Sequence, residues 1–351
     1  MSAEKGNVNR RDFLKIGGVA TAGLLAHEAL PAAVRPLPAL PENPKTFAAM
    51  PTRNLGKTGY RVGIFSLGGQ ATVELPNREE QAAAIVERAL DLGVNYIDTA
   101  ASYGGTERWS QRYIGKVMAR RRNQAYLASK TNDRTRDGSL KLLDESLKLL
   151  NTDYLDAWQL HHVSTMAEVE QIFGKGGAIE ALQQAHEQKM VRNLGVTGHA
   201  DPEVLMECLR RFPFDQILMA LNGADKHHKS FLEKLLPMAV EKQLGIIGMK
   251  IPARGHLLTS WVPGAPGKTE GAHATAVKPG TLDMREALYY VLSQPVSTVI
   301  IGCDSVAQLE ENVKLAREFT PLSEEQLAAI SAKSEPVTQQ ALFFRYPAVG
   351  H

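Results

Sequence analysis

Four side chains that can hold or move a proton follow runs of residues that have the pattern of β-strands. Asp98 closes one such run, and Tyr103 follows it by five residues. Lys130 and His161 close the next two runs. A lysine beside a tyrosine favours the tyrosinate and lowers the phenol pKa, an aspartate holds the ammonium, and a histidine can orient a carbonyl oxygen. The set predicts a tyrosine that donates or accepts a proton near neutral pH, as general acid–base catalysis requires.

Each of these residues also has an ordinary structural explanation when it is taken alone. An aspartate at a strand end commonly caps the following helix, a lysine is usually solvated, and an aromatic residue after a strand usually packs. Their joint placement after three consecutive strands favours catalysis over unrelated structural roles. His162, which follows His161, takes the next place along the chain.

Strand-like and helix-like runs alternate along the chain from Val62 onward. The strand-like runs cover residues 63–67, 94–98, 125–129, 155–161, 192–196, 215–220, 245–249 and 298–301. Residues 138–150 and 305–319 carry apolar residues at helical spacing, with Ser305 as the N-cap of the second run. Such alternation predicts an α/β fold of parallel strands, and eight units favour a closed (β/α)8 barrel over the alternative of an open sheet. Because the carboxyl ends of barrel strands share one face, the four side chains should meet there.

Three further segments are predicted around the barrel. Turn signals in residues 52–63 indicate a β-hairpin at the bottom of the barrel. The Gly/Pro-rich residues 252–281 form a long loop after the seventh strand, on the face where barrel enzymes place their active sites. The C-terminal tail, residues 341–351, holds three aromatic residues and is expected to fold over the barrel mouth, so that barrel and tail together span 52–351.

The first 33 residues have the organisation of an export signal. Basic residues precede an apolar run, 16–26, that is too short to span a bilayer comfortably. The segment resembles a twin-arginine (Tat) signal, which it matches at Arg10, Arg11, Phe13, Leu14 and Lys15. The resemblance implies export of the folded protein by the Tat machinery, to the periplasm or otherwise out of the cytoplasm. Residues 34–51 lie in a Pro-rich stretch and are expected to form an extended linker rather than part of the fold.

The composition narrows the classes of partner. The chain has 351 residues, of which 44% are hydrophobic and 22% charged, with a net charge of +2. This balance argues against binding to nucleic acid or to a membrane surface, and no stable membrane insertion of the mature domain is expected. The two cysteines, Cys208 and Cys303, are far apart and form no C-x-x-C pair, so a cysteine-built metal site is not expected.

Residues 52–320 resemble the aldo-keto reductase superfamily. The segment NYIDTAASYGG is similar to the family's Asp-Thr-Ala-x-x-Tyr-Gly, ASK to its Ser-Lys, and DAWQLHH to its Asp-x-Tyr-x-x-His. The segment GCDSVAQLEEN resembles the family's last cofactor motif. The resemblance implies hydride transfer from NADP(H) or NAD(H) to an aldehyde or ketone. It implies that Tyr103 donates the proton and that Lys130, held by Asp98, adjusts the pKa of the Tyr103 phenol. It also implies that His161 orients the substrate.

The same resemblance implies a set of cofactor-binding residues. They are Gly68, Gly69, Thr197, Asn222, Met249, Lys250, Gly302, Gln308, Glu311 and Asn312. Several of these positions depart from the family pattern. Thr197 and Gly198 replace a Ser-Asn pair, and Met249 stands where many members stack an aromatic ring on the nicotinamide. Lys250 could contact the pyrophosphate as a point charge.

The last cofactor motif departs furthest from the family pattern. Gly302 and Cys303 replace Lys-Ser, and Gln308 lies near the position of an arginine that clamps the 2′-phosphate of NADPH. Asp304 adds a negative charge, and a phosphate favours arginine over a carboxylate. These changes point to the use of NADH, or of both cofactors, rather than to a preference for NADPH.

Two alternative functions stay open on the sequence. The altered cofactor positions suggest a barrel that binds the cofactor but serves as a non-catalytic accessory or sensor protein. A barrel hydrolase would use Asp98 and a second carboxylate, but the sequence offers no obvious second acid.

Overall fold

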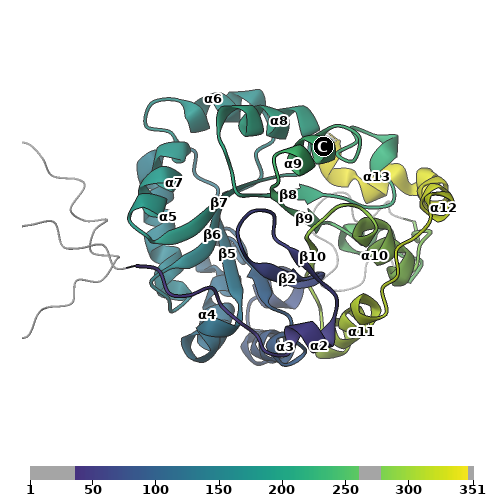
Figure 1. Cartoon of the computed structure of the whole chain (residues 1–351), viewed down its shortest axis with the longest axis horizontal. Helices are drawn as coiled ribbons and strands as arrows, with labels where there is room; N and C mark the ends of the chain where they lie inside the picture. Colours follow the sequence, from purple (N-terminus) through teal and green to yellow (C-terminus); the bar gives the residue numbers. More distant parts are fainter. Residues whose placement is uncertain (1–35, 261–277, 347–351) are drawn as a thin grey trace, which may run out of the picture.

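Eight parallel strands close into a barrel at the centre of the molecule (Figure 1). The computed structural model describes residues 36–260 and 278–346. The barrel strands are β3 Phe65–Gly68, β4 Tyr96–Asp98, β5 Tyr126–Thr131, β6 Leu155–Leu160, β7 Val191–Gly198, β8 Gln216–Ala220, β9 Gly245–Met249 and β10 Thr298–Ile301. Strand β10 pairs with both β3 and β9, which closes the sheet. All eight predicted strands and the closed barrel are confirmed, and the open sheet is excluded.

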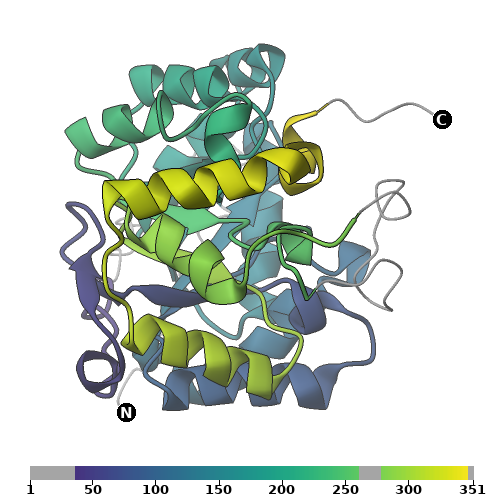
Figure 2. The ribbon, with the colours of Figure 1, turned by 90° about the vertical axis from the view of Figure 1, so that its right-hand side faces the viewer.

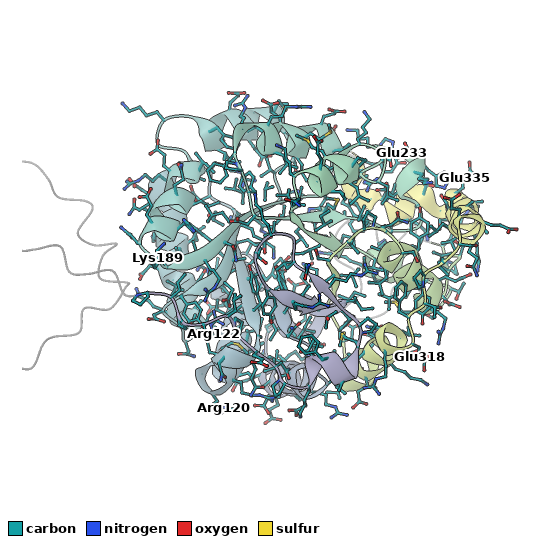
Figure 3. The ribbon with its side chains drawn as sticks, in the orientation of Figure 1. Arg120, Arg122, Lys189, Glu233, Glu318 and Glu335 are labelled. Carbon is teal, nitrogen blue, oxygen red and sulfur yellow. The ribbon has the colours of Figure 1, made fainter. Side chains whose placement is uncertain are left out.

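Helices surround the strands. They are α3 Glu79–Asp91, α4 Trp109–Arg121, α5 Arg136–Leu149, α6 Met166–Phe173, α7 Ala178–Glu187, α8 Pro202–Arg211, α9 Leu235–Glu241, α10 Met284–Leu292 and α11 Val306–Arg317. In α5, Leu140, Leu143 and Leu147 are buried, as the helical spacing predicts. The Ser305 hydroxyl caps α11 by accepting from the Gln308 N–H. Charged side chains such as Arg120, Glu233, Glu318 and Glu335 are exposed on the outside of this ring (Figure 3).

The barrel interior is a second core, separate from the one between strands and helices. Its buried members include Tyr96, Tyr126, Leu218 and Ile247. In the described residues, 36–260 and 278–346, no helix combines the length and the apolar character that crossing a bilayer requires.

The predicted hairpin closes the amino-terminal end of the barrel. Strands β1 Thr52–Asn54 and β2 Arg61–Gly63 pair antiparallel. Leu55, Tyr60 and Val62 are buried in the interior core. Gly56 has a φ of +52°, and a Cβ there would lie 2.3 Å from the Gly245 nitrogen, so only glycine fits this close approach.

Residues 36–50, which we name the N-terminal strap, correct the prediction of an extended linker over 34–51. The strap includes the short helix α2 Thr46–Ala49 and lies along the barrel's hairpin end (Figure 1). The Asn43 amide donates to the Leu90 carbonyl at 2.7 Å and to the Val94 carbonyl at 3.2 Å. Prolines remove backbone donors from the strap, but the Asn43 and Thr46 side chains donate to carbonyls at the end of α3 and in the turn that follows it. The strap therefore belongs to the fold.

The chain beyond α11 returns to the carboxyl-terminal end of the strands. Helices α12 Glu324–Ser334 and α13 Thr338–Ala341 lead to a 3-10 turn at Phe343–Arg345. Figure 2 shows α12 lying across the side of the barrel, with the described end of the tail on the side opposite the hairpin. Arg345 is buried and forms an ion pair with buried Asp225. The tail therefore folds onto the mouth face, as expected; its last residues, 347–351, lie outside the described part.

Candidate active site

A cavity of about 230 Å³ opens at the carboxyl-terminal ends of β3, β4, β9 and β10. Nine of the residues predicted for the site line it: Asp98, Tyr103, Gly68, Gly69, Met249, Lys250, Gly302, Gln308 and Asn312. The described part of the predicted loop also reaches this cavity, through Pro252, Arg254 and Leu258. Residues 261–277 of that loop lie outside the described residues.

The catalytic candidates on β4 and β5 are in direct contact. Asp98 and Lys130 are both buried, and the Lys130 ammonium donates to the Asp98 carboxylate and, at 2.8 Å, to the Thr99 carbonyl. The Lys130 nitrogen also lies 4.9 Å from the centre of the Tyr103 ring. Neighbouring parallel strands present their ends at one edge, which is why residues 32 positions apart meet here.

The electrostatics of this group correct one expectation. Burial raises the pKa of Tyr103 well above its ordinary value, and the charges of Asp98 and Glu74 raise it further. These effects outweigh the neighbouring Lys130 ammonium, which is paired with the Asp98 carboxylate. Burial likewise raises the pKa of Asp98 and lowers that of Lys130, although their contact opposes both shifts. Tyr103 is therefore a protonated phenol at neutral pH, which suits a proton donor.

His161 lies beside Tyr103. The two rings meet edge to face with centres 5.6 Å apart, and the His161 Nδ1 lies 3.2 Å from the Ser102 hydroxyl. Burial lowers the pKa of His161 well below its ordinary value, and the nearby Lys130 charge lowers it further. The imidazole is therefore neutral, and when Ser102 donates to Nδ1 the ring proton is on Nε2 and points away from Ser102.

Three of the predicted cofactor residues do not line the cavity. The buried Thr197 accepts the His162 backbone N–H at 2.9 Å. The Asn222 amide donates to the Ala341 carbonyl at 3.1 Å, and its oxygen accepts the Ala224 N–H at 3.0 Å. Glu311 is exposed on α11. The side chains of Thr197 and Asn222 thus have partners within the protein.

The cavity carries positive charge on the side of β9. The Lys250 ammonium donates to the Gln70 side-chain oxygen at 3.1 Å, and among the described residues no carboxylate lies within ion-pair distance of it. Burial lowers its pKa to about 7, and the charge of Arg254 contributes in the same direction. Lys250 has a φ of +61°, a left-handed conformation that turns the chain out of the strand. Lys250 and Arg254 thus place two basic side chains on this side of the cavity, whose lining also includes Glu74 and Asp304.

Sequence reasoning missed several lining residues. Gln70, Glu74, Arg254 and Ser260 lie in the loops after β3 and β9 and face the cavity. Their position after barrel strands was a usable signal, because loops on that face build the active site. No spacing rule, however, indicates which loop residue points inward.

Comparisons with known proteins give one consistent result. The aldo/keto reductase family model matches residues 61–335, and the twin-arginine translocation signal model matches residues 7–27. The chain is 31% identical over 308 residues to L-galactose dehydrogenase of Arabidopsis thaliana, which covers 81% of this chain and 94% of that protein. It is 24% identical over 330 residues to L-glyceraldehyde 3-phosphate reductase of Escherichia coli K12, with coverages of 82% and 93%.

Solved structures agree with the sequence relatives. The aldo-keto reductase AKR11C1 of Bacillus halodurans, in its holo form, superposes with a TM-score of 0.66 at 26% identity, over 81% of this chain and 96% of that one. An aldo-keto reductase of Klebsiella pneumoniae in complex with NADPH has the same fold, with a TM-score of 0.64 at 19% identity over 81% and 95% of the two chains. The chain belongs to the aldo/keto reductase family and is an NAD(P)-dependent oxidoreductase.

Proposed function

We propose that this protein reduces an aldehyde or ketone to an alcohol with NADH or NADPH, and that Tyr103 is the general acid. The observation that carries the proposal is the meeting of Asp98, Lys130, Tyr103 and His161 at one end of the barrel, beside a cavity lined by the candidate cofactor residues. The intact set favours catalysis over the alternative of a cofactor-binding accessory protein.

The chemistry of the cavity lining suits a dinucleotide. Lys250 and Arg254 supply cations, and the half-buried Lys250 ammonium has no carboxylate within ion-pair distance among the described residues, which suits a pyrophosphate. The amino-terminal end of α11 faces the same cavity through Gly302 and Gln308, and helix N-termini favour anions. We assign Met249 to the nicotinamide face, where its thioether can pack against a ring.

The residues of the chain perform the acid half of the reaction. When bound, the cofactor supplies the hydride. Tyr103 donates its proton to the carbonyl oxygen, and His161 hydrogen-bonds the same oxygen through Nε2. Lys130 lies over the Tyr103 ring and stabilises the negative charge that develops on the phenolate, while Asp98 keeps the ammonium in place.

The remaining assignments follow from the family and the signal. Thr197, Asn222 and Glu311 complete the proposed cofactor set, although their partners and exposure in this structure make their contribution secondary. The twin-arginine signal supports export through the Tat machinery, and we propose a periplasmic location. The boundaries of the signal at residue 33 and of the barrel region, 52–351, are proposals as well.

Oxidation of NADH and of NADPH in the presence of a panel of aldehydes and ketones tests the proposed function. Carbonyl-dependent oxidation of either cofactor by the mature protein is the expected result. Tight cofactor binding with no turnover on any carbonyl would instead favour the accessory protein.

Cofactor selectivity is the first quantitative prediction. Because Asp304 faces the cavity and Gln308 replaces an arginine, NADH should bind at least as tightly as NADPH. Fluorescence titration of the two cofactors measures this ratio. The variant Gln308→Arg should shift the ratio by about tenfold toward NADPH, because a charge-assisted contact to the 2′-phosphate contributes about 1.5 kcal/mol. A wild-type preference of more than tenfold for NADPH would contradict the interpretation.

The affinity for the cofactor should depend on pH through Lys250. In the free protein Lys250 loses its proton as the pH rises through about 7. A bound pyrophosphate stabilises the ammonium and raises that pKa, so binding takes up a proton above this pH. The affinity for NADH should therefore be constant at lower pH and fall by up to about tenfold per unit above neutrality. Titrations across this range should show a flat profile for Lys250→Met, and an equally steep profile for that variant would refute the assignment.

A further inference from the structure

Two histidines beside the catalytic candidates are joined through their rings. His162 follows His161, and His199 follows β7. Their Nδ1 atoms lie 2.7 Å apart, and their ring centres are separated by 4.7 Å. His162 is exposed, whereas His199 is 8% exposed. Two imidazoles at this distance share one hydrogen bond, in which one ring must donate and the other accept.

The backbone holds His162 in a strained conformation for this contact. His162 has a φ of +53°, a left-handed backbone conformation that residues other than glycine rarely adopt. Its N–H donates to the Thr197 hydroxyl, and its carbonyl accepts from Arg134 at 3.2 Å. Glu168, in the capping box of α6, bonds Arg134 at 2.7 Å and fixes it. Strain that the surroundings enforce in this way is typical of functional sites.

The pair is neutral in the ordinary pH range. Burial is the largest cause that lowers the pKa of each imidazole, and the charge of Lys250 lowers both further. With one Nδ1–H shared between two neutral rings, one ring carries a proton on Nε2 and the other has a lone pair there. Among the residues that the structure describes, no atom bonds either Nε2. The pair thus offers one donor and one acceptor.

The pair lies next to the proposed reaction centre. The His162 ring centre is 6.5 Å from that of His161, whose own ring contacts Tyr103. Phe344 from the C-terminal tail meets His199 edge to face at 5.8 Å and packs on the interior core of the barrel. The pair is therefore within reach of a substituent on a substrate whose carbonyl oxygen lies at Tyr103 and His161.

We propose that the His162–His199 pair is a subsite for a hydroxyl group of the substrate, so that the preferred substrates are hydroxylated aldehydes or ketones. A hydroxyl group both donates and accepts, which matches the two free Nε2 atoms. An unsubstituted alkyl chain at the same place would leave both atoms desolvated and without partners. This inference rests on the proposed carbonyl reduction and specifies its substrate class.

The test compares glyceraldehyde with propanal, which has the same carbon chain but no hydroxyl groups. The measured quantity is the ratio of kcat/KM for the two aldehydes. The hydration of each aldehyde in water is the same for every variant, so a change in the ratio reports the protein alone. His162→Phe and His199→Phe should each lower the ratio by about tenfold, because each removes one hydrogen bond to the substrate.

A matched control replaces a histidine far from the mouth. His186→Phe, on the outer helix α7, should leave the ratio at the wild-type value. A ratio that stays within about twofold of wild type in both pair variants overturns the subsite, whatever happens to the absolute rates. If wild-type protein reduces neither aldehyde nor any other carbonyl of the panel, the proposed function fails and the subsite with it. Reduction of propanal with an unaltered ratio overturns the subsite alone.

Discussion

Replacing Tyr103 by phenylalanine should lower kcat for carbonyl reduction by about 10³, within the range that positioned acid–base groups contribute. The variant keeps the ring that lies beneath Lys130 and beside His161 but loses the only atom that donates the proton. Water would be a poor substitute, because in the proposed reaction Tyr103 presents a protonated phenol, its pKa raised by burial, to the carbonyl oxygen. Steady-state oxidation of the preferred cofactor, with saturating aldehyde, measures the effect.

The binding of cofactor separates this loss from misfolding. Tyr103→Phe should titrate with NADH in the same concentration range as wild type, since the proposed contacts to the anion come from Lys250, Arg254 and α11. Retention of more than a tenth of the wild-type kcat would remove Tyr103 from the role of general acid. Lys130→Met is the companion variant: it should lose activity and also stability, because it leaves the buried Asp98 carboxylate without its partner.

Replacing Arg345 by methionine should lower the free energy of unfolding by about 3–5 kcal/mol, the usual cost of breaking a buried ion pair by removal of one partner. The Arg345 guanidinium pairs with Asp225 and also donates to the carbonyls of Ala220 at 2.9 Å and His228 at 2.7 Å. The central carbon of the guanidinium, Cζ, lies 4.5 Å from the centre of the Phe231 ring. All of these groups are left without the guanidinium in the variant. Denaturant unfolding followed by circular dichroism measures the change.

Two controls show whether charge or shape is responsible. Arg345→Lys keeps the charge but loses the planar fork, so it should recover only part of the stability. The double variant Arg345→Met with Asp225→Asn should be more stable than Arg345→Met alone, because it removes the uncompensated buried charge. The asparagine keeps an oxygen that can accept from the Ser230 hydroxyl and the Leu232 N–H, as Asp225 does. An Arg345→Met protein with wild-type stability would show that the tail is not anchored through this pair. Its Phe344 would also be released from His199, which links tail anchoring to the mouth.

The sequence predicted the barrel well because its signals are periodic and local. Each barrel strand is a short apolar run, and the Ser305 hydroxyl caps α11 as predicted. The catalytic set was predicted for a related reason. Asp98, Lys130 and His161 lie at the ends of consecutive parallel strands, and barrel topology alone brings such ends together.

The remaining features depend on contacts that no local pattern reveals. The pKa of Tyr103 rises because burial and Asp98 outweigh a lysine whose charge is already paired. Thr197 and Asn222 occupy the expected positions in the sequence, yet their hydrogen bonds go to His162 and to the tail. The strap was predicted as a linker because its prolines disfavour regular structure, but tertiary contacts through Asn43 hold it on the barrel and it includes the short helix α2.

The N-terminal strap also bears on the order in which the molecule assembles. Its partners are the end of α3 through Asn43, the backbone of Asn123 ahead of β5, and Arg192 in β7, which bonds the Pro38 carbonyl at 2.7 Å. Because these contacts join the strap to distant parts of the sequence, we expect them to form only once the barrel is in place. The strap follows closely behind a signal for export in the folded state. We expect the strap to resist proteolysis only when the barrel has folded.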